Sequence, residues 1–132
     1  AITDIPGSSR VFDCGFVTYA NAAKQDLLGL PEDVLTQHGA VSSEVARAMA
    51  QGARDKSGAD LAIATSGIAG PGGGSDDKPV GLVWFGLATQ DTTQSESHVF
   101  RGDREQIRSQ AVEKALELLL QATESIPKPS SD

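Results

Sequence analysis

The sequence contains little that would place the protein outside a reducing compartment or next to nucleic acid. Its single cysteine, Cys14, excludes an internal disulfide. The 11 Lys and Arg residues are outnumbered by 18 Asp and Glu residues, and the net charge of -7 is the opposite of what a nucleic-acid-binding surface requires. No apolar run approaches the roughly 20 residues of a membrane helix, and no signal peptide is visible. We therefore expect a cytoplasmic protein without nucleic-acid or membrane partners.

Residues that bind metals are also scarce. The two histidines, His38 and His98, have no cysteine or carboxylate cluster at ligand spacing, so we expect no metal site. Cys14 lies between Asp13 and Gly15, which supply no cation that would activate a thiol. We expect Cys14 to be buried by packing within a strand rather than to take part in catalysis.

What the chain does contain is a series of strand and helix signals that fit one domain. Residues 11–19 are rich in β-branched and aromatic side chains and predict a first strand. Residues 20–30 predict a short helix that Gly29 and the following proline end. A third element is a helix with Ser42 as its N-cap and Met49 in its core face, ending at Gly58; its many alanines would let it lie close to a sheet.

A glycine-rich loop separates two apolar strands in the middle of the chain. Residues 61–65 and 80–88 predict these strands, and the second has apolar residues on both faces, as a central strand covered on two sides needs. The loop contains five glycines, which suit an anion or oxyanion site; a flexible surface connection is the alternative. Its GxxGxG spacing fits neither the dinucleotide-binding motif nor the P-loop, since Lys78 is followed by Pro79.

The C-terminal third predicts an edge strand at residues 95–100 and then a long helix. Asp103 and Gln106 fit the N-cap and N3 positions of that helix, and an apolar stripe follows at Ile107, Ala111, Ala115, Leu118 and Ala122. Arg104 and Arg108 lie near its N-terminus, where the helix dipole favours acids, so they are candidates for a phosphate site; two solvated arginines are the alternative. The element order predicts one α/β layered domain over residues 1–125 with a mixed sheet, followed by a disordered tail at 126–132.

The string from Ser66 to Ala88, SGIAGPGGGSDDKPVGLVWFGLA, closely resembles the signature of the CinA C-terminal domain family, also known as nicotinamide mononucleotide (NMN) deamidases. The resemblance extends from about Thr3 to Ala122. It implies helices on both faces of the sheet, a homodimer, no cofactor, and hydrolysis of the carboxamide of NMN to nicotinate mononucleotide and ammonia in pyridine nucleotide salvage. The alternative is a non-catalytic nucleotide-binding or regulatory module of a competence- or damage-inducible protein.

The resemblance also implies roles for individual residues. The segment ending at Tyr19 and Lys24 matches the family's tyrosine and lysine, which work with a serine nucleophile. Without the resemblance, a packed tyrosine and a solvated surface lysine would be the simpler interpretation. Donors near Thr65, Ser66 and Gly67 would stabilise an oxyanion, with Gly70 in the same binding loop, and the Gly-Asp-Arg match makes Arg104 a substrate-phosphate ligand.

One part of the family's pattern has no match in these 132 residues. The family's serine nucleophile lies in a Glu-Ser-Cys-Thr-Gly-Gly segment ahead of the position that corresponds to Ala1. Neither Ser8, Ser9 nor Ser66 occupies the matching position. We therefore expect a domain that carries most of the enzyme's site but lacks the N-terminal helix and the nucleophile.

Overall fold

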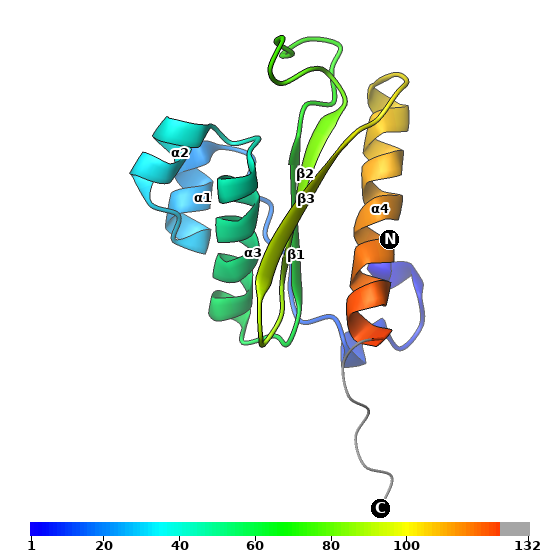
Figure 1. The fold of residues 1–132 in the computed structure, drawn as a ribbon. Coiled ribbons are helices and arrows are strands. Elements are labelled where there is room, and N and C mark those ends of the chain that lie inside the picture. The colour runs from blue at the N-terminus through cyan, green and yellow to red at the C-terminus, as the bar shows by residue number, and fades with distance from the viewer. Residues whose placement is uncertain (125–132) are drawn as a thin grey trace, which may run out of the picture.

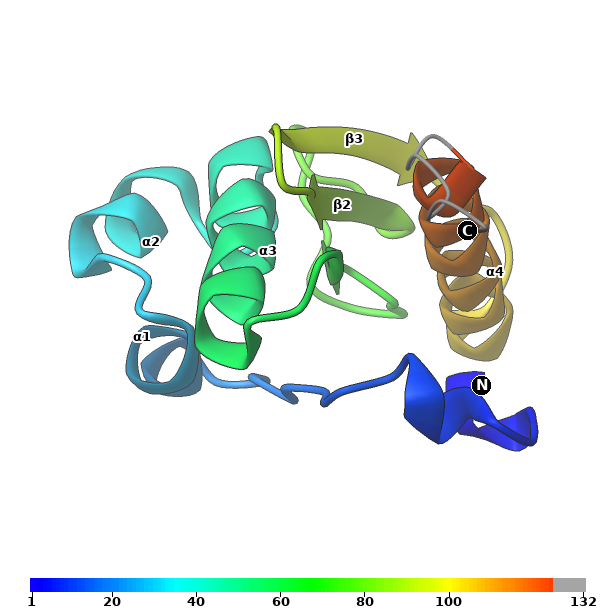
Figure 2. The ribbon, with the colours of Figure 1, turned by 90° about the horizontal axis from the view of Figure 1, so that it is seen from below.

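The computed structural model describes residues 1–124, so the predicted tail at 126–132 lies outside the described residues. Two short 3-10 turns come first, followed by helices and strands in the order η1 (Ile2–Asp4), η2 (Ser8–Arg10), α1 (Asn21–Leu28), α2 (Glu32–His38), α3 (Ser43–Ser57), β1 (Ala62–Gly67), β2 (Leu82–Ala88), β3 (Thr93–Val99) and α4 (Arg104–Glu124). Helix α3 covers one face of the sheet and α4 the other, with α1 and α2 outside α3 (Figures 1 and 2). This confirms the α/β layered fold with helices on both faces.

The sheet has the strand order β1-β2-β3. Both pairings are antiparallel, with Thr65 opposite Phe85 and Phe85 opposite Glu96. Strand β2 is therefore central, and five of its seven residues are buried, as the apolar residues on both of its faces predicted. A mixed sheet was expected; the described strands form an antiparallel one, because the segment expected as the first strand joins no ladder.

Residues 11–19 are the main error of the sequence prediction. Val11 lies in a turn, and residues 12–19 have no regular secondary structure and pair with no strand among the described residues. The even positions Phe16 and Thr18 face the protein, while Val17 and Tyr19 are each 90% exposed. β-Branched and aromatic residues fit a pleated, half-buried surface without requiring a ladder partner. Cys14 is also exposed, not buried as predicted, because no neighbouring strand covers it.

The core divides into two clusters, one on each face of the sheet. Between α1, α2, α3 and the sheet lie eight buried residues: Leu28, Leu30, Leu35, Val45, Met49, Ala50, Ala64 and Ala88. Between α4 and the sheet lie Val83, Phe85, Ile107 and Leu118, with Ala111 and Ala115 packed against them. The predicted apolar stripe of α4 and the core position of Met49 are confirmed.

The helix ends follow the predicted capping chemistry. The Ser42 hydroxyl accepts from the backbone N–H of Val45, and Gly29 and Gly58 end α1 and α3 in the left-handed conformation. At the start of α4, Asp103 accepts from the N–H of Gln106, and the Gln106 side chain accepts from the N–H of Asp103 in return.

Helix α2 was not predicted from the sequence. It has seven residues, only Leu35 is buried, and no side chain caps its N-terminus. The signal that could have revealed it is Pro31 followed by Glu32 and Asp33, since proline and acids favour a helix start. In residues 1–124 no helix has the length and apolar character needed to cross a membrane.

Candidate functional site

Lys24 lies in the second turn of α1 and points inward. Its side chain is 5% exposed, and its amine donates to the backbone carbonyl of Thr18 at 2.6 Å and to that of Tyr19 at 3.3 Å. No carboxylate among residues 1–124 forms an ion pair with it. Burial lowers the pKa of Lys24, because removal from water penalises the charged amine. The neutral amine that a general base needs therefore forms more readily here than on a surface lysine.

The backbone of Tyr19, not its side chain, contacts Lys24. The contact with the amine is made by the Tyr19 carbonyl, while the phenol is exposed to solvent. The simpler interpretation of the sequence, a packed tyrosine and a solvated lysine, is therefore reversed: the lysine is buried and the tyrosine is exposed. Thr18 was missed, because a carbonyl that accepts from a lysine carries no sequence signal.

The predicted oxyanion segment lies at the end of β1. Thr65 is exposed, while the Ser66 hydroxyl donates to the backbone carbonyl of Ala40 at 2.7 Å. Gly67 approaches β2 closely, since a Cβ there would lie 2.7 Å from Val83 Cγ2. These contacts fix the end of β1 between β2 and the turn that follows α2.

The glycine-rich loop rises from β1 and is held on its other side by α4. Arg104 Nη1 donates to the carbonyl of Gly70 at 2.9 Å. Gly70 is buried with a φ of +79°, a conformation that favours glycine. Guanidinium has five N–H donors, so this bond leaves Arg104 with donors for a phosphate oxygen as well.

A third contact closes the loop against α2. Lys78 Nζ donates to the carbonyl of His38, the last residue of α2, at 2.7 Å. A cation at a helix C-terminus is favourable because the carbonyls there lack intrahelical partners. The imidazole of His38 in turn lies 3.6 Å from a Glu44 carboxylate oxygen. Nothing in the sequence connects Lys78 with His38, because the two residues are 40 positions apart.

The predicted residues thus form two groups. Ser66, Gly67, Gly70 and Arg104 gather around the glycine-rich loop at the end of the sheet seen at the top of Figure 1. Lys24 and Tyr19 form the other group beside α1. No hydrogen bond among residues 1–124 joins Lys24 to the loop group.

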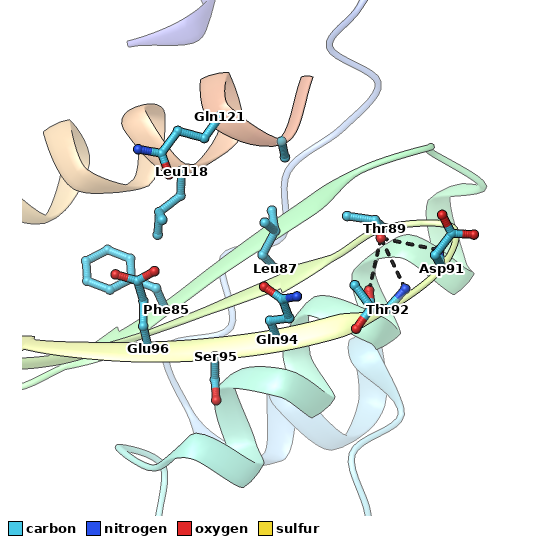
Figure 3. A pocket seen from close by; sticks show the side chains of 11 residues that line it. Phe85, Leu87, Thr89, Asp91, Thr92, Gln94, Ser95, Glu96, Leu118 and Gln121 are labelled. Carbon is cyan, nitrogen blue, oxygen red and sulfur yellow. Dashed lines mark hydrogen bonds between the residues drawn. The ribbon is translucent and has the colours of Figure 1, made fainter. Parts of the chain in front are cut away.

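A surface cavity lies away from both groups. It has a volume of about 480 Å³ between the sheet and the C-terminal half of α4, and none of the predicted site residues lines it. Phe85, Leu87 and Leu118 face its interior, with the carboxylates of Asp91 and Glu96 at its edges (Figure 3). Within residues 1–124, no three potential metal ligands lie together.

The contacts of Ser66, Gly70 and Arg104 lie in the region that carries the family resemblance. The sequence profile of the CinA C-terminal domain matches residues 1–123. The chain belongs to the CinA C-terminal domain family. The match runs through every described element, so the family assignment covers the fold as well as the glycine-rich loop.

Relatives and solved structures agree with the CinA assignment. The nicotinamide-nucleotide amidohydrolase PncC of Enterobacter agglomerans is 54% identical over 121 residues, which are 91% of this chain and 74% of that protein. A CinA-like protein of Akkermansia muciniphila is 50% identical over 127 residues. The crystal structure of the competence/damage inducible protein CihA from Agrobacterium tumefaciens superposes with a TM-score of 0.87 at 46% identity, over 90% of this chain and 73% of that one.

Many CinA relatives are much longer than this chain. The match to the Akkermansia protein spans 96% of this chain but only 31% of that protein. Two further curated relatives are covered over 29% and 30% of their length.

Proposed function

We propose that this chain is the amide-hydrolysing domain of a nicotinamide-nucleotide amidohydrolase that converts NMN to nicotinate mononucleotide and ammonia. The observation that carries the proposal is the buried, carboxylate-free amine of Lys24, whose lowered pKa suits a general base. A relative at 54% identity bears the name nicotinamide-nucleotide amidohydrolase, which supplies the substrate class.

The proposed reaction is acyl transfer through a serine. Lys24 takes the proton of the serine hydroxyl as the oxygen adds to the carboxamide carbon. The C–N bond then breaks, and the nitrogen leaves as ammonia with the proton that Lys24 returns. Water hydrolyses the resulting ester, which releases the carboxylate and restores the serine.

The proposal requires a serine from outside these 132 residues. Ser66 is already committed to the carbonyl of Ala40, and neither Ser8 nor Ser9 matches the family position. The Glu-Ser-Cys-Thr-Gly-Gly segment of the family would supply the nucleophile. Tyr19 would orient the proton between serine and lysine, which requires its exposed phenol to turn toward Lys24 once substrate binds.

The glycine-rich loop would bind the rest of the nucleotide. In this proposal the N–H groups near Thr65, Ser66 and Gly67 face the developing oxyanion. Such donors typically lower the activation barrier by about 3–4 kcal/mol. Arg104 binds the phosphate with the donors that its bond to Gly70 leaves over.

Ammonia release from NMN by the full natural protein tests the proposal. Lys24→Ala and Lys24→Arg should each lower kcat by about 10²- to 10⁴-fold, because arginine restores the charge but cannot act as a base. Lys56→Ala, which removes an exposed lysine from the last turn of α3, is the matched control and should leave kcat unchanged. The 132-residue chain should release no ammonia.

A binding or regulatory module is the second candidate. Two observations favour it: the phenol of Tyr19 is exposed, and within residues 1–124 no hydrogen bond joins Lys24 to the loop residues. Calorimetric titration with NMN separates the two. Binding by the full protein without ammonia release would make the module the better account.

A further inference from the structure

The turn at the end of α2, residues 38–40, has three consecutive backbone carbonyls, and each accepts a hydrogen bond from the side chain of another part of the fold. The donor and acceptor pairs are Lys78 Nζ with His38 at 2.7 Å, the Ser42 hydroxyl with Gly39 at 2.8 Å, and the Ser66 hydroxyl with Ala40 at 2.7 Å. Ser66 lies in β1, just before the glycine-rich loop, and Lys78 lies at the end of that loop. This turn, here named the 38–40 turn, therefore holds the loop at both of its ends.

Between these ends, residues 71–77 depend on Lys78 for their hydrogen bonds. All of them are exposed, and in the part of the chain that the structure describes only Ser75 among them forms hydrogen bonds. Its N–H donates to the Lys78 carbonyl at 2.8 Å, and its hydroxyl accepts from the Lys78 N–H at 3.2 Å. The exposed span is thus bonded to Lys78, and Lys78 is bonded in turn to the end of α2.

The Lys78 amine is directed to the end of α2 and not to the acids beside it. Asp76 and Asp77 directly precede Lys78, yet within residues 1–124 no ion pair joins either carboxylate to the amine. A Cβ at residue 39 would lie 2.9 Å from Lys78 Nζ, so the glycine at that position leaves the space that the amine occupies. Both observations indicate a specific seat for the amine on the 38–40 turn.

The 38–40 turn also links the two groups of predicted site residues. Leu28 of α1 and Leu35 of α2 belong to one buried cluster, and the N–H of Leu30 between these helices donates to the carbonyl of Lys24 at 3.4 Å. Helices α1 and α2 are therefore packed into the same part of the core, and α2 ends at the turn that Lys78 contacts. The bond from Lys78 to His38 fixes the glycine-rich loop against the part of the molecule that carries Lys24.

We infer that Lys78 is a positioning residue for nucleotide binding, whose bond to His38 holds residues 71–77 in the conformation that receives the nucleotide. The inference rests on the proposed function, in which the glycine-rich loop binds the rest of the nucleotide. A loop that is already ordered loses little conformational entropy when the ligand binds, so the restraint strengthens binding. The chemical step uses Lys24, which Lys78 does not contact, and it should proceed at the same rate once the nucleotide is bound.

Steady-state ammonia release from NMN by the full natural protein tests this role. Lys78→Met should raise KM about five- to tenfold and leave kcat within about twofold, which is the opposite of the split expected for Lys24→Ala. Lys78→Arg should restore most of the affinity, because a guanidinium can also donate to the His38 carbonyl. Lys56→Met, at the exposed end of α3, is the matched control and should change neither constant. An unchanged KM in Lys78→Met, or a KM as high in Lys78→Arg, would overturn the inference.

Gly39→Ala tests the same bond from the side of the turn. Its added methyl displaces the Lys78 amine without altering the lysine, so this variant should also raise KM. In the Lys78→Met background the bond is already absent, and Gly39→Ala should then raise KM by less than about twofold further. Multiplicative effects of the two substitutions would overturn the inference. Circular dichroism of each variant checks that the fold is intact.

Calorimetric titration of the full protein with NMN separates this inference from the proposed function. The Kd of Lys78→Met should exceed that of the original protein about five- to tenfold, whether or not ammonia is released. Binding without ammonia release would therefore refute the hydrolysis alone, and the ratio of the two Kd values would still decide the role of Lys78. Equal Kd values would overturn the inference, and an original protein that does not bind NMN would overturn both proposals.

Discussion

At the scale of single residues, Lys24 is the most unusual feature of the molecule. Lysine is rarely buried without a carboxylate, because the charged amine loses its hydration. Here two carbonyls from the preceding segment, Thr18 and Tyr19, replace part of that hydration. These two hydrogen bonds therefore tie α1 to the segment that precedes it.

The pH dependence of stability should reveal this lysine. Its pKa in the folded protein is below the ordinary 10.5, so between the two values the unfolded chain binds more protons. The free energy of unfolding of the original protein, relative to Lys24→Met, should therefore rise with pH up to about 10.5. Urea unfolding from neutral to alkaline pH measures this difference. The exposed Lys56→Met should show no such trend, and a difference that stays flat for Lys24→Met would contradict the assignment.

The hydrogen-bond partners of the predicted site residues could not be predicted from the sequence. Ser66 and Arg104 were both identified from the resemblance, but their partners are the backbone carbonyls of Ala40 and Gly70, 26 and 34 residues away. A carbonyl is present at every position of the chain, so nothing in the sequence distinguishes these two. The burial of Lys24 was equally hidden, because its neighbours along α1 are mostly exposed.

At the scale of elements, α3 and β2 approach each other closely. A Cβ at Gly86 would meet the backbone carbonyl of Ala46 and lie 3.2 Å from the Cβ of Ala50. Both alanines are fully buried. The expectation that a helix of small residues lies close to the sheet is thus confirmed, and the glycine on the strand is the other half of the same contact.

Gly86→Ala should be strongly destabilising for that reason. The added methyl meets backbone atoms, so helix and strand must separate, and we expect a loss of about 1–3 kcal/mol in the free energy of unfolding. Gly72→Ala adds the same methyl where nothing lies within 4 Å, and it should change stability by less than about 0.5 kcal/mol. Chemical denaturation compares the two variants. Equal changes in their free energies of unfolding would show that the close approach of α3 and β2 does not affect stability.

The bond from Lys78 to α2 should control the motion of the glycine-rich loop. Lys78→Met removes a half-exposed contact, so we expect a change in global stability within about 0.5 kcal/mol. Amide hydrogen exchange in residues 70–77 should nevertheless become faster, because the loop loses its bond to His38. Unchanged exchange in that segment would show that the contact does not restrain the loop.

Elements with their own end signals were predicted best. Ser42, Asp103 and Gln106 marked real helix starts, and the glycines after α1 and α3 marked real ends. Residues 11–19 were misread as a strand because a composition rich in β-branched and aromatic residues cannot report whether a ladder partner is present. Helix α2 was missed because seven residues with one buried leucine carry almost no periodicity.

At the scale of the whole molecule, the resemblance identified the protein family, which composition alone could not do. Composition and spacing led to a layered α/β domain with a glycine-rich loop, and the profile match over residues 1–123 established the family. The two groups of predicted site residues lie beside different helices, α1 and α4, so their arrangement could only be known from the fold.

The three bonds that hold the glycine-rich loop also constrain the order in which the protein folds. Ser66 bonds to the turn after α2, 26 positions away, and Lys78 bonds to the end of α2, 40 positions away. Arg104 on α4 bonds to the loop 34 positions before it. Contacts between distant parts of a chain carry the largest loop-closure cost and form after local structure. The loop therefore has all three of its bonds only when α2, which packs on α3, and α4, which packs on the sheet, are both in place. The conformation of the loop thus depends on contacts from both the N-terminal and the C-terminal half of the chain.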